Sequence, residues 1–186
     1  PVKYHIVTNL NEENGLAQPL KFDKYVATTG FYKTLGYHNA VISSIEKKYP
    51  TLENVDIRTA YDLANAYKGL LKGSNYLKLM YSILDQVRIN SKSFDVNTLI
   101  DRTFASDHDN AVFHLNIEIA YVHARLKETS KAMEILSQVC SMIKGDKVMK
   151  VYYNDVLAEV YIKRNRRDLA IETLKKASTL DLDTQS

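Results

Sequence analysis

The chain has 186 residues, of which 45% are hydrophobic and 25% are charged, and both values are ordinary for a globular domain. Lysine and arginine exceed aspartate and glutamate by only 3 charges, less than a DNA-binding domain usually concentrates on one face. The scarcity of glycine (6) and proline (3) disfavours an all-β fold, the 1 cysteine excludes an internal disulfide, and no uncharged apolar run is long enough to span a membrane.

The beginning of the chain gives a first indication of its compartment. The segment Pro1–Val7 lacks the charged and then apolar layout of a signal peptide, and no lipidation motif is visible at either end. We therefore expect an intracellular, reducing environment, by default the cytoplasm, with the nucleus or an organelle left open. The first residue is Pro rather than Met, which fits either a removed initiator Met or a fragment of a longer protein.

Residues 1–20 are polar and rich in helix breakers, which predicts an N-terminal arm. From residue 21 to residue 186 the apolar residues recur with helical periodicity, which predicts one helical domain. The expected helices cover about 21–34, 37–49, 56–72, 75–89, 110–126, 130–143, 147–164 and 167–180. Because most of the connections are short, we expect four antiparallel helical hairpins.

The breaks between these helices carry turn residues. Pro50 ends the second helix, Gly73 is expected to cap the C-terminal end of the third, and Gly145 with Asp146 separates the sixth from the seventh. Residues 90–109 are longer than an ordinary connection and are predicted to be an inserted segment with a short helix around 96–104.

An internal repeat is the most informative feature of the sequence. Small residues recur at Ala27, Ala64, Ala120 and Ala158, at intervals of 37, 56 and 38 residues. In the last unit, Leu157, Ala158 and Tyr161 of one helix are followed by Ala170, Leu174 and Ala177 of the next. Small side chains at these spacings let the two helices of a hairpin cross at close distance.

This pattern resembles the tetratricopeptide repeat (TPR), which has a period of about 34 residues. The resemblance implies an all-α, TPR-like α-solenoid of about four hairpins in a right-handed superhelix. The second unit departs from the pattern, because Leu79 stands where the family has a small residue, and the third has His123 in place of an aromatic residue. Other two-helix repeats, including the pentatricopeptide type, and an unrelated helical bundle remain as alternatives.

The sequence contains no motif that predicts an enzyme, a cofactor or a metal site. It has no phosphate-binding glycine loop, no HExxH and no Cys or His pair with zinc spacing. Asp107, His108 and Asp109 form the only local cluster that could support an atypical hydrolase, and helix capping explains them more simply. Cys140 lies on an apolar helix face and is expected to be buried.

The resemblance also implies a concave groove lined by the first helix of each hairpin. The candidate partner-binding residues are Tyr25, Thr29, Tyr32, Tyr61, Asn65, Lys68, Ile117, Tyr121, Asp155 and Glu159. Tyrosine is enriched at binding surfaces because its rigid ring offers contact area and its hydroxyl a hydrogen bond. We therefore expect a non-enzymatic module that binds a peptide or a segment of a partner protein, as a scaffold or as a subunit of a larger complex.

Charge narrows the expected partner. TPR domains that clamp the acidic tails of heat-shock chaperones use Lys, Arg and Asn along the groove, whereas here the last groove helix presents Asp155 and Glu159. This excludes such a tail and favours an apolar or partly basic peptide. Nucleic acid is not an expected partner, because the basic run Lys163–Arg167 falls at a turn and no groove position is regularly basic.

Two alternative functions are kept: an RNA-binding helical repeat, and the ligand-sensing TPR domain of a peptide-responsive transcription regulator, which would need a DNA-binding helix-turn-helix elsewhere. The last helix carries Ile171, Leu174 and Leu180, so self-association through the C-terminal hairpin is also expected.

Overall fold

The computed structural model describes residues 32–33, 35–50, 55–89 and 108–179, and this part of the chain is α-helical without a β-strand. The predicted arm at 1–20, nearly all of the first predicted helix, the inserted segment from 90 to 107 and its short helix lie outside the described residues. So do the last residues, 180–186.

The described helices begin and end close to their predicted bounds. They are α2 (His38–Lys48), α3 (Ile57–Gly69), α4 (Gly73–Ile89), α5 (His108–Arg125), α6 (Thr129–Val139), α7 (Lys147–Lys163) and α8 (Arg167–Ser178), with a 3-10 turn at Cys140–Met142. An aspartate caps the N-terminus of two of them, α3 and α7, as the capping preference of short acidic side chains predicts. Asp56 accepts from the backbone N–H of Thr59 and Asp146 from that of Met149, each at 2.9 Å.

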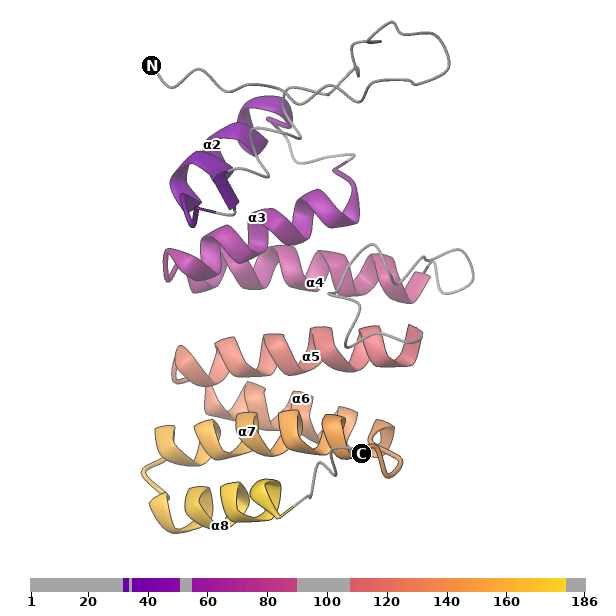
Figure 1. The fold of residues 1–186 in the computed structure, drawn as a ribbon, viewed down its shortest axis with the longest axis vertical. Helices are drawn as coiled ribbons and strands as arrows, with labels where there is room; N and C mark the ends of the chain where they lie inside the picture. The colour runs from indigo at the N-terminus through magenta and orange to yellow at the C-terminus, as the bar shows by residue number, and fades with distance from the viewer. Residues whose placement is uncertain (1–31, 34, 51–54, 90–107, 180–186) are drawn as a thin grey trace, which may run out of the picture.

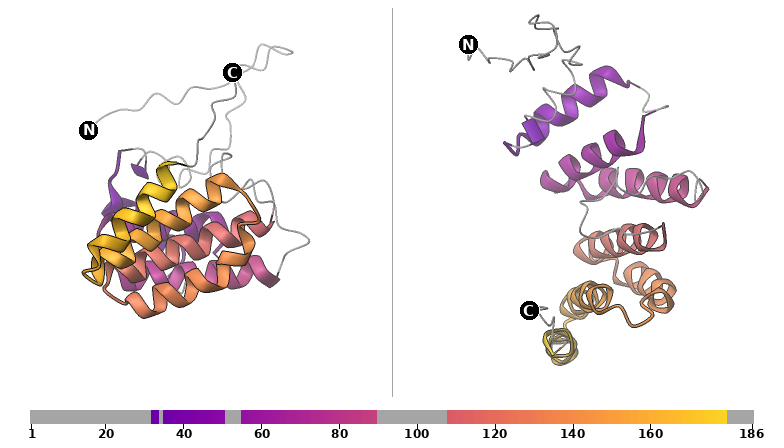
Figure 2. Two further views of the ribbon diagram at one scale, coloured as in Figure 1. Left: turned by 90° about the horizontal axis from the view of Figure 1, so that it is seen from below. Right: turned by 45° about the vertical axis from the view of Figure 1, so that its right-hand side comes forward.

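The helices pack on one another in chain order. α3 and α4, α5 and α6, and α7 and α8 form hairpins, while α2 packs on α3, α4 on α5, and α5 on α7. Figure 1 shows an elongated stack in which the turns inside these hairpins lie along one edge, and Figure 2 shows the same stack from below and from the side. Each hairpin therefore contacts mainly its neighbours in the sequence.

One backbone turn is repeated four times. A residue with positive φ lies shortly before α2, α4, α6 and α8, namely Gly36 (φ 69), Leu71 (58), Lys127 (64) and Asn165 (59). At each of them the N–H donates to the carbonyl three residues earlier, and the next N–H donates to the carbonyl five residues earlier, at 2.9–3.1 Å. These two bonds define the Schellman motif, which satisfies carbonyl groups left free at a helix C-terminus.

The turn gives an exact register for comparing the units. The four positive-φ residues are 35, 56 and 38 residues apart, so the first interval is shorter than the 37 residues that the alanines predict. In this register Tyr32 corresponds to Tyr67 and His123. The backbone carbonyl of each accepts the hydrogen bond of the motif that spans five residues. The assignment of Gly73 as a helix cap was wrong, since Leu71 takes the left-handed position and Gly73 begins α4.

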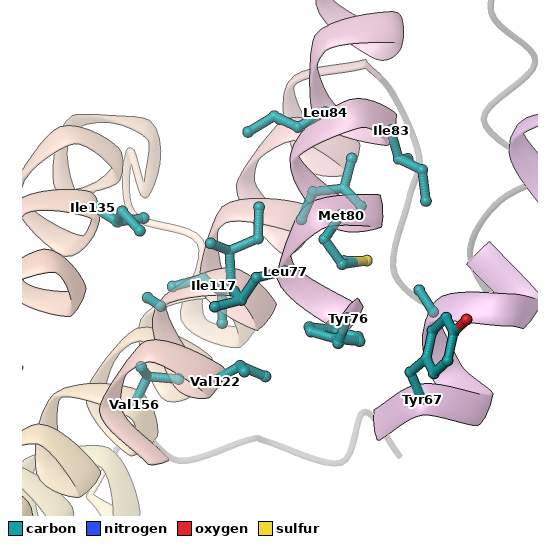
Figure 3. Packing of buried hydrophobic residues seen from close by; sticks show 14 of the residues in the cluster. Tyr67, Tyr76, Leu77, Met80, Ile83, Leu84, Ile117, Val122, Ile135 and Val156 are labelled. Atoms are coloured by element: carbon teal, nitrogen blue, oxygen red, sulfur yellow. The ribbon is translucent and has the colours of Figure 1, made fainter. Parts of the chain in front are cut away.

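The small residues of the repeat lie in the core. Ala64, Ala120 and Ala158 are each at most 1% exposed, as the close crossing of paired helices requires. Five residues after the turn residue, the second helices carry Ala132 and Ala170, but α4 carries Tyr76, which is also buried. The departure in the second unit is therefore at Tyr76 and not at Leu79. Figure 3 shows this part of the core, where Leu77, Ile117 and Val122 project between α4 and α5.

Gly69 allows a close contact between α2 and α3. A Cβ atom at this position would lie 2.3 Å from Nε2 of His38, well inside van der Waals contact. Because His38 begins α2 and Gly69 ends α3, the absent side chain lets these two helix ends meet.

The turn register predicts opposite effects for two substitutions. We expect Gly36→Ala to lower the free energy of unfolding by about 1 kcal/mol, because a Cβ is disfavoured in the left-handed region. A Cβ at Gly36 meets no atom within 4 Å, so the change isolates this backbone effect. We expect Leu71→Gly to raise stability by about as much, since Leu71 is 86% exposed and loses few contacts. Urea denaturation measures both, and a similar gain in the control Leu71→Ala would contradict the explanation.

Candidate functional site

A cluster of charged and aromatic side chains joins the second and third hairpins. Lys68 of α3 forms an ion pair with Glu118 of α5, and the Tyr76 hydroxyl donates to the same carboxylate at 2.9 Å. The Lys68 ammonium lies 5.7 Å from the ring centre of Tyr76 and 5.8 Å from that of Tyr121. Lys68, Tyr76, Glu118 and Tyr121, called the Glu118 cluster below, thus combine an ion pair with two cation–π contacts.

The Glu118 carboxylate affects tyrosines on three helices. Burial raises the pKa of Tyr76 far above its ordinary value, and the negative charge of Glu118 and its hydrogen bond raise it further. Burial and then Glu118 also raise the pKa of Tyr61 on α3. Burial, Asp155 and Glu118 raise the pKa of Tyr152 on α7. These phenols therefore stay neutral, and that of Tyr76 hydrogen-bonds the carboxylate.

A second group of charges joins the third and fourth hairpins. Nη1 of Arg125 on α5 lies 3.6 Å from Oε1 of Glu159 on α7, and Nζ of Lys163 lies 3.3 Å from the same oxygen. This oxygen is buried and has no hydrogen-bond partner among the described residues. Two cations therefore neutralise Glu159, so this residue does not make the groove end acidic as the sequence predicted. Asp155 is exposed, and partial loss of water around its carboxyl raises its pKa.

Ion pairs between successive units follow the turn register. Lys33 pairs with Asp62 and Lys68 pairs with Glu118. Both lysines lie three residues before a turn residue, and both carboxylates lie nine residues before the next one. Arg125 with Glu159 continues the series one unit later, with the cation displaced by one residue and the carboxylate by three, which is about one helical turn. These pairs hold neighbouring units in a fixed relation, and each is partly screened by solvent.

A cavity of about 370 Å³ lies beside the Glu118 cluster at the turn edge of the stack. It is formed by the end of α3, the α3–α4 turn, the start of α4 and the second half of α5. Its lining residues are Lys68, Leu71, Gly73, Tyr76, Tyr121, Val122, Arg125 and Leu126. Leu71 and Leu126 are exposed, and the described residues that line the cavity include two cations and no carboxylate.

The structure brings together only part of the predicted groove. Tyr61, Asn65, Lys68 and Tyr121 lie in or beside the Glu118 cluster, where Asn65 hydrogen-bonds Tyr61. Ile117 is 5% exposed and belongs to the core, because its side of α5 faces α4. Tyr32 takes the register position of Tyr67 rather than a groove position. Tyr25 and Thr29 lie outside the described residues.

Three residues with polar side chains at the site were not predicted, namely Tyr76, Glu118 and Arg125, nor were the lining residues Leu71, Gly73, Val122 and Leu126. The helical pattern places Glu118 next to the apolar residue Ile117, and only the turn register shows that it repeats the position of Asp62. Tyr76 belongs to a second helix, and the expected groove included first helices alone. Arg125 ends α5, beyond the positions that the resemblance assigns to the groove.

The histidines have structural partners. Nε2 of His108 donates to the Val87 carbonyl at 3.1 Å, which joins the start of α5 to the end of α4. His123 is buried, with the Tyr81 hydroxyl 2.8 Å from its Nε2 and Glu128 Oε2 2.5 Å from its Nδ1. A carboxylate can only accept, so Nδ1 donates to Glu128, and Nε2 shares a hydrogen bond with the Tyr81 hydroxyl. Asp107 lies outside the described residues, which contain no group of three metal-ligating side chains.

Two other predictions have clear outcomes. Cys140 is exposed, and the expectation that it is buried was wrong, because α6 ends at Val139 and the following 3-10 turn carries Cys140 away from the apolar face. The basic run at the last turn is exposed, as predicted. Lys163 pairs with Glu159, and Arg166 pairs with Asp168 at 3.5 Å.

Comparison with known proteins assigns no family. A scan against protein-family models and a search of curated proteins both find no match. None of the helices in the described ranges has both the length and the apolar character that crossing a bilayer requires.

The Lys68–Glu118 pair is expected to couple the second and third hairpins. Both side chains are more than one-third exposed, so a double-mutant cycle with Lys68→Met and Glu118→Gln should give a coupling of about 0.5–1 kcal/mol at low salt. The coupling should fall at 1 M salt, because ions screen exposed pairs. Lys176 and Glu172, which pair within α8, serve as the control and should give about 0.3–0.5 kcal/mol. No coupling at low salt would contradict the pairing.

Glu128 predicts a pH dependence of stability. The hydrogen bond from His123 and then that from Lys131 hold the pKa of this carboxyl below its ordinary value of 4.5. A carboxyl whose pKa is lower in the folded state stabilises the fold above its unfolded pKa, and this contribution is lost as the pH falls through the folded value. Urea denaturation should therefore show Glu128→Gln less stable than the wild type at pH 7, and the difference should shrink below pH 4.5. Glu134→Gln is the control, and an equal pH-dependent loss there would contradict the assignment.

Proposed function

We propose that the chain is a TPR-like solenoid that binds a segment of a partner protein, and that the cavity beside the Glu118 cluster is part of its binding surface. The observation that carries this proposal is the cavity of about 370 Å³, which is lined by two successive hairpins and opens beside exposed leucines. This volume lies within the range of small-ligand pockets and admits one or two large side chains of a peptide.

The repeat supports a binding module rather than an enzyme. The hairpins pack one after another and share one repeated turn geometry. Such a stack forms an extended surface to which neighbouring units contribute equivalent residues. Tyr121 supplies a partly buried ring at this surface, and Leu71 and Leu126 supply apolar area at the mouth of the cavity. Tyrosine in a well-packed pocket is enriched among the hot spots of protein interfaces.

An RNA-binding solenoid has less support. Such a protein needs unpaired basic or amide side chains at equivalent positions of each unit. Here Lys33, Lys68 and Arg125 each face a carboxylate of the following unit. The face that they share is close to electrically balanced, which favours a peptide over a polyanion.

Site-specific photo-crosslinking tests the proposed function. We would place p-benzoylphenylalanine at position 71, in place of an 86% exposed Leu71 that lines the cavity, and expect one discrete protein adduct in the native lysate. The matched control is position 89, because Ile89 is 80% exposed at the far end of α4. Three outcomes would contradict the proposal: no adduct at position 71, identical adducts at both positions, or an adduct with RNA alone. Circular dichroism must show that both variants keep their folded helices.

A further inference from the structure

We propose that the cavity at the turn edge selects a partner segment that combines carboxylates with large apolar side chains. The inference rests on the proposed function and adds the chemistry of the partner. It differs from the expectation of an apolar or partly basic peptide, which rested on the charges of Asp155 and Glu159, because Arg125 and Lys163 neutralise Glu159.

Lys68 and Arg125 are the two charged residues that line the cavity, and each already faces a carboxylate beside it. Glu118 neutralises Lys68, whereas Arg125 and Lys163 share the single charge of Glu159, so one cation is left in excess at Arg125. α4 begins at Gly73, within this lining, and has no acidic residue in its first turn. The positive end of the α4 dipole therefore adds to the field of Arg125. A carboxylate entering here meets the surplus cation and the start of α4, whereas an ammonium group meets repulsion.

Arg125 is the cation that can take up a new carboxylate. Its side chain is 54% exposed, and its contact with Glu159 is 3.6 Å, longer than a hydrogen bond. Within the described residues, the guanidinium makes no hydrogen bond, so its N–H groups are free to donate. Glu159 keeps Lys163 at 3.3 Å when Arg125 turns to a ligand, so the buried carboxylate is not left without a cation.

The remaining lining favours apolar side chains beside that carboxylate. Leu71 and Leu126 are exposed at the mouth, and Val122 and the rings of Tyr76 and Tyr121 lie deeper. Gly73 keeps the space open, because a Cβ atom there would lie 3.0 Å from the Leu126 side chain. Burial of a leucine or phenylalanine at this place removes apolar surface of both partners from water.

The test measures the binding of three labelled synthetic peptides to the full chain by fluorescence anisotropy. All three have the same leucine and phenylalanine residues, and they carry aspartate, asparagine or lysine at the positions between. We expect the aspartate peptide to bind about tenfold more tightly than the asparagine peptide, as one charge-assisted hydrogen bond provides. The lysine peptide should bind least. Equal binding of the aspartate and asparagine peptides, or tightest binding of the lysine peptide, would overturn the proposal.

Variants separate the cavity from general electrostatics. Arg125→Gln should weaken the aspartate peptide about tenfold and leave the asparagine peptide unchanged. Lys127→Gln removes the same charge from an exposed turn position outside the lining and should change neither. An equal loss with Lys127→Gln would overturn the proposal. If Arg125→Gln fails to fold, Gly73→Leu provides the second variant, because its side chain fills the cavity; retained binding of the aspartate peptide would then overturn it.

The two proposals fail in different ways. A position-71 adduct together with no preference for the aspartate peptide would leave the binding function standing and remove the inferred partner chemistry. Loss of the adduct would remove the binding function itself.

Discussion

The turn that ends each first helix is the constraint on which the rest of the structure depends. Two hydrogen bonds around a left-handed residue fix where each first helix stops and where its partner begins. Since this geometry is the same at four turns, the residues that follow by a given number of positions reach equivalent places. Small residues then fall at the crossings, and lysines and carboxylates of neighbouring units meet. The fold accepts Leu71 and Lys127 in an unfavourable backbone region to keep this geometry, which shows that tertiary packing outweighs the local preference.

Much of the fold could be predicted from the sequence, because helical periodicity and small residues at crossings are local signals. The all-α class and the bounds of the described helices follow from them to within a few residues. The exact register could not be predicted, because no glycine marks three of the four turns. Ala27 therefore suggested an interval of 37 residues where the turns give 35, and in the register of the turns Tyr32 corresponds to Tyr67. Cys140 was misplaced for a related reason, since a helix end that tightens into a 3-10 turn leaves little trace in the hydrophobic pattern.

The site was harder to predict than the fold, because it depends on contacts between units. Ile117 has the right spacing for a groove position, yet packing of α4 against α5 buries it and leaves its neighbour Glu118 to face the tyrosines. The charge of Glu159 was visible in the sequence, but its compensation by Arg125 from another hairpin was not. A register taken from the turns would have aligned Glu118 with Asp62, and this alignment is the signal that sequence reasoning could have used.

Tyr76 connects the departure from the repeat to the site. At the position where the later hairpins have Ala132 and Ala170, α4 buries the ring of Tyr76. The Tyr76 hydroxyl needs a hydrogen-bond partner, because an unsatisfied buried hydroxyl destabilises the fold. Glu118 provides that partner, Lys68 neutralises the carboxylate, and the Lys68 ammonium in turn lies over the rings of Tyr76 and Tyr121. A single large residue at a crossing position thus requires a polar network between two hairpins, and the cavity lies beside that network. The irregular unit, rather than the regular ones, is therefore where a polar network and a cavity lie side by side.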